Sequence, residues 1–285
     1  MAPKKKAGGD KKKKEGDEED LSVENFWKAY KKKCVEYNCD VSKIIKGAME
    51  KFFEEGDEIK KLHMWEELGW PGVKAIVESL IAAKYPHMVS IRLWKTYCED
   101  EGVRILCTFL EQCSSILCLE LLDNKVTYLG CEFLGKTLTP GPKCPPICIL
   151  KLDHNNFGSR GLNALLKGIQ SNEFLKTLSF AYCGIDAEAS RGLFEMLIFS
   201  KSHLEELILT GNNLRNEGAI MVLQGVSAAK ELKKIYLADN QFNEADEMLE
   251  AIKKCMTRNK NLARYDFRNN DLKDKGKCKI TVNIF

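Results

Sequence analysis

Residues 204–218 read Leu-Glu-Glu-Leu-Ile-Leu-Thr-Gly-Asn-Asn-Leu-Arg-Asn-Glu-Gly. Counting from Leu204, apolar side chains stand at positions 0, +3 and +5, an asparagine stands at +8, and another apolar residue stands at +10. The same pattern recurs at intervals of about 29 residues, starting at Met88, Ile116, Ile147, Leu175, Leu204, Leu232 and Leu262. A period of this length is typical of one supersecondary unit stacked on copies of itself, so the sequence predicts a solenoid.

Each position in the unit has a predicted role. The 0/+3/+5 spacing predicts a short strand whose +3 and +5 side chains point inward. A side-chain amide at +8 has both a donor and an acceptor, so it can satisfy the turns of adjacent repeats; the asparagines at this position are Asn124, Asn155, Asn212, Asn240 and Asn270. Later apolar residues, such as Leu193 and Leu197, predict the inner face of a helix. Repeated strand, turn and helix require parallel strands with right-handed crossovers.

The stretch from Leu204 to Gly218 and its counterpart from Ile147 to Gly161 closely resemble the leucine-rich-repeat family in its ribonuclease-inhibitor-like subtype. The resemblance implies an α/β horseshoe with a parallel sheet on the concave side and helices on the convex side. It says little about function, because one fold serves many partners. Relatives in the subtype include ribonuclease inhibitors, activators of Ran-type GTPases, pointed-end actin-capping proteins and axonemal proteins of cilia.

The chain divides into four predicted parts. Residues 1–20 are rich in lysine and acidic residues and predict a disordered tail. Residues 21–57 have a helical apolar period and predict an N-terminal cap. Residues 58–276 hold about eight repeats, the first of them degenerate, and residues 277–285 predict an extended C-terminal tail.

A cap is expected because the first repeat of a solenoid would otherwise expose its core face. In the predicted second helix of the cap, Asp40 is a candidate N-cap and Gly56 a candidate stop. The aromatic and cysteine residues of this helical pair make it look most like the axonemal group of the family.

Composition limits the cellular locations and the kinds of partner that the sequence predicts. The 285 residues include 12 cysteines without an export signal, which favours reduced thiols and a cytoplasmic location. No apolar run approaches the roughly 18 residues needed to span a membrane. The net charge of +3 does not favour nucleic acid as a partner. The Lys-rich N-terminal tail is a candidate for binding an acidic surface, such as a tubulin tail, phospholipid or RNA; the alternative is a solubilising tail.

The concave face is the candidate functional surface, because no element remains to cover it. Trp65, Trp94 and Leu122 hold the +6 position of successive units, so they should lie on strands about 5 Å apart. Adjoining large apolar side chains on an exposed face mark interaction sites, and Trp, Tyr and Arg are their usual anchors. The predicted protein-binding residues are Trp65, Arg92, Trp94, Leu122, Lys151, Asp153, Tyr182, Tyr236 and Arg268. The alternative is that the cap or the basic tail covers Trp65 and Trp94.

Other motifs do not favour catalysis. Gly130 to Thr137 matches the P-loop pattern, but the repeat predicts a helix there, followed by Pro140, so nucleotide binding is not expected. Cys144 and Cys148 supply half of a zinc site at best. The histidines fall at unrelated repeat positions and pair with no nucleophile. We therefore expect no catalytic residue, cofactor or metal.

The sequence thus predicts a non-enzymatic protein-interaction scaffold. The resemblance of its cap to the axonemal group favours a cytoskeletal or ciliary (axonemal) assembly. One alternative is a regulator of a small GTPase, although the acidic C-terminal extension of the Ran activators is missing. The other is an inhibitor-type binder of another protein, although acids are few on this concave face and mix with Arg92 and Lys151.

Overall fold

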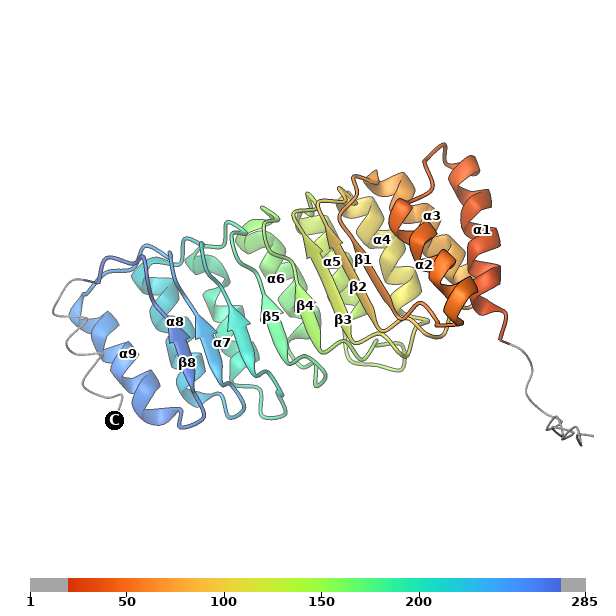
Figure 1. Cartoon of the computed structure of the whole chain (residues 1–285). Coiled ribbons are helices and arrows are strands. Elements are labelled where there is room, and N and C mark those ends of the chain that lie inside the picture. Colours follow the sequence, from red (N-terminus) through yellow and green to blue (C-terminus); the bar gives the residue numbers. More distant parts are fainter. Residues whose placement is uncertain (1–19, 273–285) are drawn as a thin grey trace, which may run out of the picture.

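The computed structural model describes residues 20–272 (Figure 1). The predicted N-terminal tail and the C-terminal tail, together with the end of the last repeat, lie outside the described residues. Among residues 20–272, no helix combines the length and apolar character that a bilayer crossing requires.

The strands form one eight-stranded sheet in chain order, and every neighbouring pair is parallel. This confirms the predicted α/β solenoid. The strands are β1 (Lys61–Met64), β2 (Ser90–Trp94), β3 (Cys118–Leu122), β4 (Ile149–Lys151), β5 (Thr177–Ser179), β6 (Glu206–Ile208), β7 (Lys234–Tyr236) and β8 (Arg264–Asp266).

Helices connect the strands and cover one face of the sheet, as Figure 1 shows. The helices are α1 (Ser22–Glu36), α2 (Lys43–Glu55), α3 (Gly69–Ala82), α4 (Glu99–Leu110), α5 (Tyr128–Thr137), α6 (Gly158–Ile169), α7 (Ser190–Leu197), α8 (Arg215–Ala228) and α9 (Asp246–Arg258). A 3₁₀ turn, η1 (Ala187–Ala189), precedes α7. We call the other face of the sheet, which bears the +2, +4 and +6 side chains, the open face.

The core lies between the sheet and the helices. Inward strand residues are fully buried, as Leu150 and Leu207 show, and they meet buried helix residues such as Leu165 and Leu193. Because each repeat buries its apolar side chains against the next one, the core is continuous from α1 to the last strand.

Asparagine side chains join the turns of successive repeats, as predicted. Asn155 Oδ1 accepts hydrogen bonds from the backbone N–H of Asn124 (2.9 Å) and of Val126 (3.0 Å), both in the preceding repeat. Its Nδ2 donates to the carbonyl oxygens of Leu121 (2.7 Å) and Leu152 (2.8 Å). A buried side chain thus supplies hydrogen-bond partners to backbone groups at the point where the chain leaves the sheet.

The cap differs from expectation at one helix start. Helix α2 is capped by Ser42, whose hydroxyl accepts a hydrogen bond from the Ile45 N–H, and not by Asp40. Ser42 is placed for this role because its backbone N–H also donates to the Tyr30 hydroxyl in α1 (3.1 Å). Gly56 ends α2 in the left-handed region, with φ of 79°, as predicted.

Candidate functional site

Two tryptophans stand out on the open face. Met64 pairs with Leu93 in the β1–β2 register, and Trp65 and Trp94 follow these residues directly. Trp94 is in turn the register partner of Leu122 on β3. Trp65 is 66% exposed and Trp94 57% exposed, so the cap helices α1 and α2 leave both rings open. The three apolar side chains begin on neighbouring strands, as the sequence predicted.

A row of polar side chains runs beside this apolar group. His63, Arg92, Glu120 and Lys151 are successive register partners across β1 to β4. Glu120 Oε1 lies 3.5 Å from Arg92 Nε and 3.3 Å from Lys151 Nζ, and the Glu120 side chain is only 12% exposed. One carboxylate therefore holds two cations in place, and it also lines them up along the Trp65–Trp94–Leu122 group.

Asp153 has a structural task in addition to its predicted place on the open face. Its Oδ1 accepts hydrogen bonds from the Ser179 hydroxyl (2.6 Å) and the Ala181 N–H (2.7 Å) in the next repeat. A carboxylate engaged in this way is less available to a partner than an exposed one.

The predicted residues of the C-terminal repeats lie apart from the tryptophans. Tyr236 is half-buried on β7, in register with Asp266 on β8. Arg268 donates two hydrogen bonds to Asp266, from Nε (2.8 Å) and from a terminal nitrogen (2.6 Å). This fork-to-fork pair neutralises the charge that Arg268 would offer to a partner.

Tyr182 belongs to the turn after β5. It has a left-handed backbone, with φ of 54°, and its ring stacks on His154 with centroids 4.9 Å apart and planes 9° from parallel. Gly211 leaves space for the tyrosine ring, since a Cβ there would lie 2.2 Å from Tyr182 Cδ1. Tyr182 and His154 thus form a small aromatic stack at the margin of the open face, three repeats from Trp94.

Two residues near the tryptophans were not among the predicted site residues. Lys61 is exposed at the start of β1, and His63 is half-buried two residues later. Burial lowers the pKa of His63 below 6.5, and the charges of Arg92 and Lys61 lower this pKa further. Both residues occupy outward repeat positions, so the periodicity could have included them.

The other sequence motifs are part of the scaffold. Gly130 to Thr137 lies within helix α5, as expected, and the Gly130 N–H donates to the Asp100 carboxylate (2.9 Å). The Cys144 thiol donates to the Leu138 carbonyl (3.4 Å), and the Cys148 thiol donates to the Pro146 carbonyl (3.6 Å). Within residues 20–272, no three His, Cys, Asp or Glu side chains are grouped to hold a metal ion.

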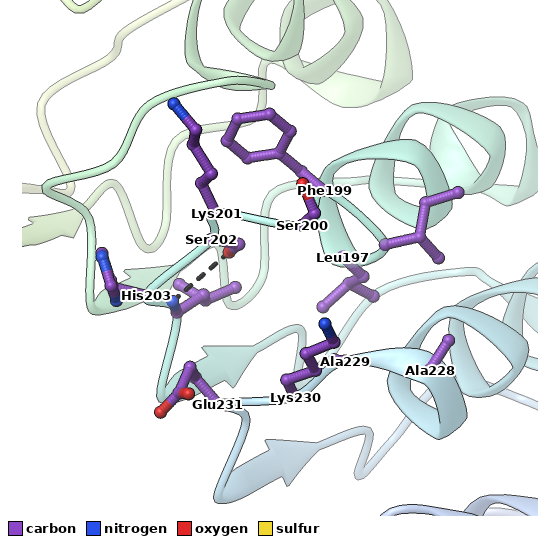
Figure 2. A pocket seen from close by; sticks show the side chains of 12 residues that line it. Leu197, Phe199, Ser200, Lys201, Ser202, His203, Ala228, Ala229, Lys230 and Glu231 are labelled. Atoms are coloured by element: carbon purple, nitrogen blue, oxygen red, sulfur yellow. Dashed lines mark hydrogen bonds between the residues drawn. The ribbon is translucent and has the colours of Figure 1, made fainter.

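A cavity of about 290 Å³ lies at the C-terminal ends of α7 and α8 (Figure 2). The cavity can be traced to one position of the repeat. In two units the residue three places before the next repeat start bonds to a carbonyl in the preceding repeat: Asn172 Nδ2 donates to Leu138 O (2.9 Å), and Asn259 Nδ2 donates to Val226 O (2.9 Å). Lys201 and Ala229 occupy this place in two successive units and line the cavity. We therefore interpret it as a gap in a second ladder of side chains.

Comparisons with known proteins agree with this architecture. The family model described as "Leucine Rich repeat" matches residues 200–223. "NACHT, LRR and PYD domains-containing protein 12" of Mus musculus is 26% identical over 224 residues, which is 78% of this chain and 21% of that protein. "Ribonuclease inhibitor" of Sus scrofa is 23% identical over 269 residues, covering 84% of this chain and 58% of the inhibitor.

Among solved structures, the Rad7–Elc1 complex of yeast gives a TM-score of 0.46 at 12% identity, covering 92% of this chain and 73% of that one. The strand–turn–helix units, the asparagine ladder and the matches in sequence define the class: the chain is a leucine-rich-repeat protein. Its repeats are of the ribonuclease-inhibitor-like subtype. It spans only part of the length of these curated relatives.

Proposed function

We propose that the chain is a protein-binding scaffold without catalytic activity, and that it binds its partner at the N-terminal end of the open face. The observation that carries the proposal is the exposed pair Trp65 and Trp94, in register beside Leu122. Monomeric proteins rarely leave such large apolar side chains together in water, and tryptophan is a frequent anchor of interfaces.

The flanking residues support the same surface. Arg92 and Lys151 are held by Glu120 next to the apolar group, so their charged ends are positioned before a partner arrives. A fixed side chain loses less conformational freedom on binding than a mobile one. The C-terminal residues Tyr236 and Arg268 extend the surface as secondary contacts.

We place the scaffold in a cytoskeletal or ciliary assembly in the cytoplasm. The resemblance of the helical cap to the axonemal group supports this placement. A second candidate is an inhibitor-type binder, which the similarity to ribonuclease inhibitor supports. The two candidates differ in the partner, and they use the same open face.

The test compares partner recovery by the wild-type chain, by a Trp65→Ala/Trp94→Ala variant and by a Tyr236→Ala variant, each with a tag in ciliated cells. We expect the tryptophan variant to lose the proteins that the wild type recovers, with a smaller loss for Tyr236→Ala. Circular dichroism must show that the tryptophan variant is folded. Full recovery by the folded tryptophan variant contradicts the proposed surface, and recovery of a ribonuclease in place of axonemal proteins favours the second candidate.

A further inference from the structure

We infer that the segment bound at Trp65 and Trp94 is acidic, with large apolar side chains that pack on the two indole rings and carboxylates that meet Lys61 and Arg92. The inference rests on the proposed function, because it names the chemistry of the partner for that same surface. It is carried by the balance of charge around the tryptophans.

Cations exceed carboxylates on this part of the open face. Lys61 and Arg92 are the outward cations of β1 and β2, and Glu120 is the outward carboxylate of β3. The single Oε1 of Glu120 is shared between Arg92 and Lys151. Within the described residues, Lys61 has no carboxylate within 4.0 Å. With Asp153 at the end of β4, two outward carboxylates stand against the three outward cations Lys61, Arg92 and Lys151, and Lys61 is the cation that neither carboxylate contacts.

Other nearby carboxylates are already occupied. Glu66 accepts a hydrogen bond from the Lys43 N–H (3.0 Å) and another from the Ser42 hydroxyl, so it serves the cap. Asp123 lies 3.6 Å from Lys95 Nζ in the adjacent turn. Glu67 is exposed, but it follows the strand and lies outside the outward row. None of these acids lies within 4.0 Å of Lys61 or Arg92 among the described residues, so both cations remain available to a partner on the open face.

The pKa of His63 is a second indication that the surroundings are positively charged. It is the register partner of Arg92 and stands two residues from Lys61 on the same face. Its pKa is lowered mainly by burial; Arg92 and Lys61 add to the effect because they repel the protonated ring, and they outweigh the opposing attraction of Glu120. A carboxylate from a partner would relieve this repulsion.

Single-stranded nucleic acid also binds aromatic and basic surfaces, but it needs a continuous row of available cations to follow its phosphates. Farther along the open face two of the three outward cations are paired within the protein: Lys234 Nζ lies 3.6 Å from Glu206, and Arg268 lies 2.6 Å from Asp266, which leaves Arg264 isolated on the last strand among the described residues. The positive region is therefore short and borders an apolar group. This arrangement fits a protein segment better than a nucleic-acid strand.

The experiment selects from a displayed library of random 16-residue peptides on the folded full-length chain. We expect the enriched peptides to combine Asp or Glu with Leu, Phe or Trp. One enriched peptide is then synthesised with a fluorophore, together with a copy in which Gln replaces Glu and Asn replaces Asp. Fluorescence anisotropy compares both peptides with an oligouridine of equal negative charge.

The variants separate the two proposals. The Lys61→Glu/Arg92→Glu variant is expected to bind the acidic peptide about ten-fold more weakly, or weaker still. Lys61→Gln, which removes an exposed and unpaired charge, should lower the affinity by a few-fold. Lys234→Glu, at the far end of the open face, is the matched control and should change the affinity by less than about two-fold. Binding of the acidic peptide should also weaken as salt is added.

Each outcome has one meaning. Loss of binding in Trp65→Ala/Trp94→Ala together with equal binding of the Gln/Asn copy overturns the acidic partner and leaves the surface standing. Unchanged peptide binding by the folded tryptophan variant, or a selection that enriches nothing above that variant, overturns both. Tighter binding of oligouridine than of the acidic peptide also overturns the inference, in favour of nucleic acid.

Discussion

The Nδ2 of Asn155 donates a 2.7 Å hydrogen bond to the carbonyl oxygen of Leu121, one repeat earlier. The same side chain accepts from two N–H groups of that repeat, and it is fully buried. It therefore joins the turns of two successive units, which also pair with each other along β3 and β4.

Replacement of Asn155 by Ala should lower the free energy of unfolding by about 3 kcal/mol, because several backbone groups would remain buried without a partner. The measurement is urea unfolding followed by circular dichroism. Asn156→Ala, at an exposed neighbouring position, is the control and should cost less than about 0.5 kcal/mol. A loss below about 1 kcal/mol for Asn155→Ala would mean that water replaces the amide without penalty.

Helices α5 and α6 make backbone contact at two glycines. A Cβ added to Gly168 would lie 1.8 Å from the Gly135 carbonyl oxygen, which is backbone and cannot rotate away. Gly168→Ala should therefore cost about 3 kcal/mol or more, because the helices must move apart. Gly47 in α2 has no neighbour within 4 Å of such a Cβ, so Gly47→Ala should stabilise the chain by about 0.5–1 kcal/mol. Thermal unfolding of both variants checks the contrast, and an unchanged midpoint for Gly168→Ala would show that the two helices can separate at little cost.

The gap in the second ladder should be repairable. Ala229 ends α8 with φ of −68° and ψ of 123°, close to the −82° and 99° of Asn259 at the end of α9, whose amide bonds to three carbonyls. Ala229→Asn should fill part of the cavity in Figure 2 and stabilise the protein by about 1 kcal/mol.

The matched control for this repair is Ala228→Asn, since Ala228 is exposed one residue earlier. We expect no gain in thermal midpoint from it, because asparagine is the poorer helix former. If both variants lower the midpoint, the cavity does not present carbonyl oxygens to the new amide.

The pKa of His63 should be measurable by NMR titration of its ring proton and should lie below 6.5. A depressed pKa means that the native state binds the proton more weakly than the unfolded chain. The stability from neutral His63 is therefore fully present above pH 6.5 and is lost as the pH falls through the lower native value. In Lys61→Gln/Arg92→Gln the pKa should rise towards 6.5, while Lys234→Gln should leave it unchanged. An unchanged pKa in the first variant would assign the whole depression to burial.

The periodicity alone determined much of this protein. An apolar side chain must leave water, so the spacing of residues such as Leu204, Leu207 and Leu209 indicates which side chains face the core and, by difference, which lie on the open face. The same spacing indicates that a buried Asn must meet backbone groups of its neighbours. The spacing therefore predicts that Trp65 and Trp94 lie side by side on the sheet.

Only the tertiary structure decided which outward side chains form ion pairs and hydrogen bonds with one another. Periodicity reports the face on which a residue lies, but an ion pair or hydrogen bond depends on distances of a few ångströms between repeats of unequal length. Glu120 therefore could not be assigned to Arg92 and Lys151 from spacing, nor Asp153 to the backbone of the next repeat. The contact of Gly135 with Gly168 likewise depends on how closely two stacked helices approach, which the sequence of either helix does not specify.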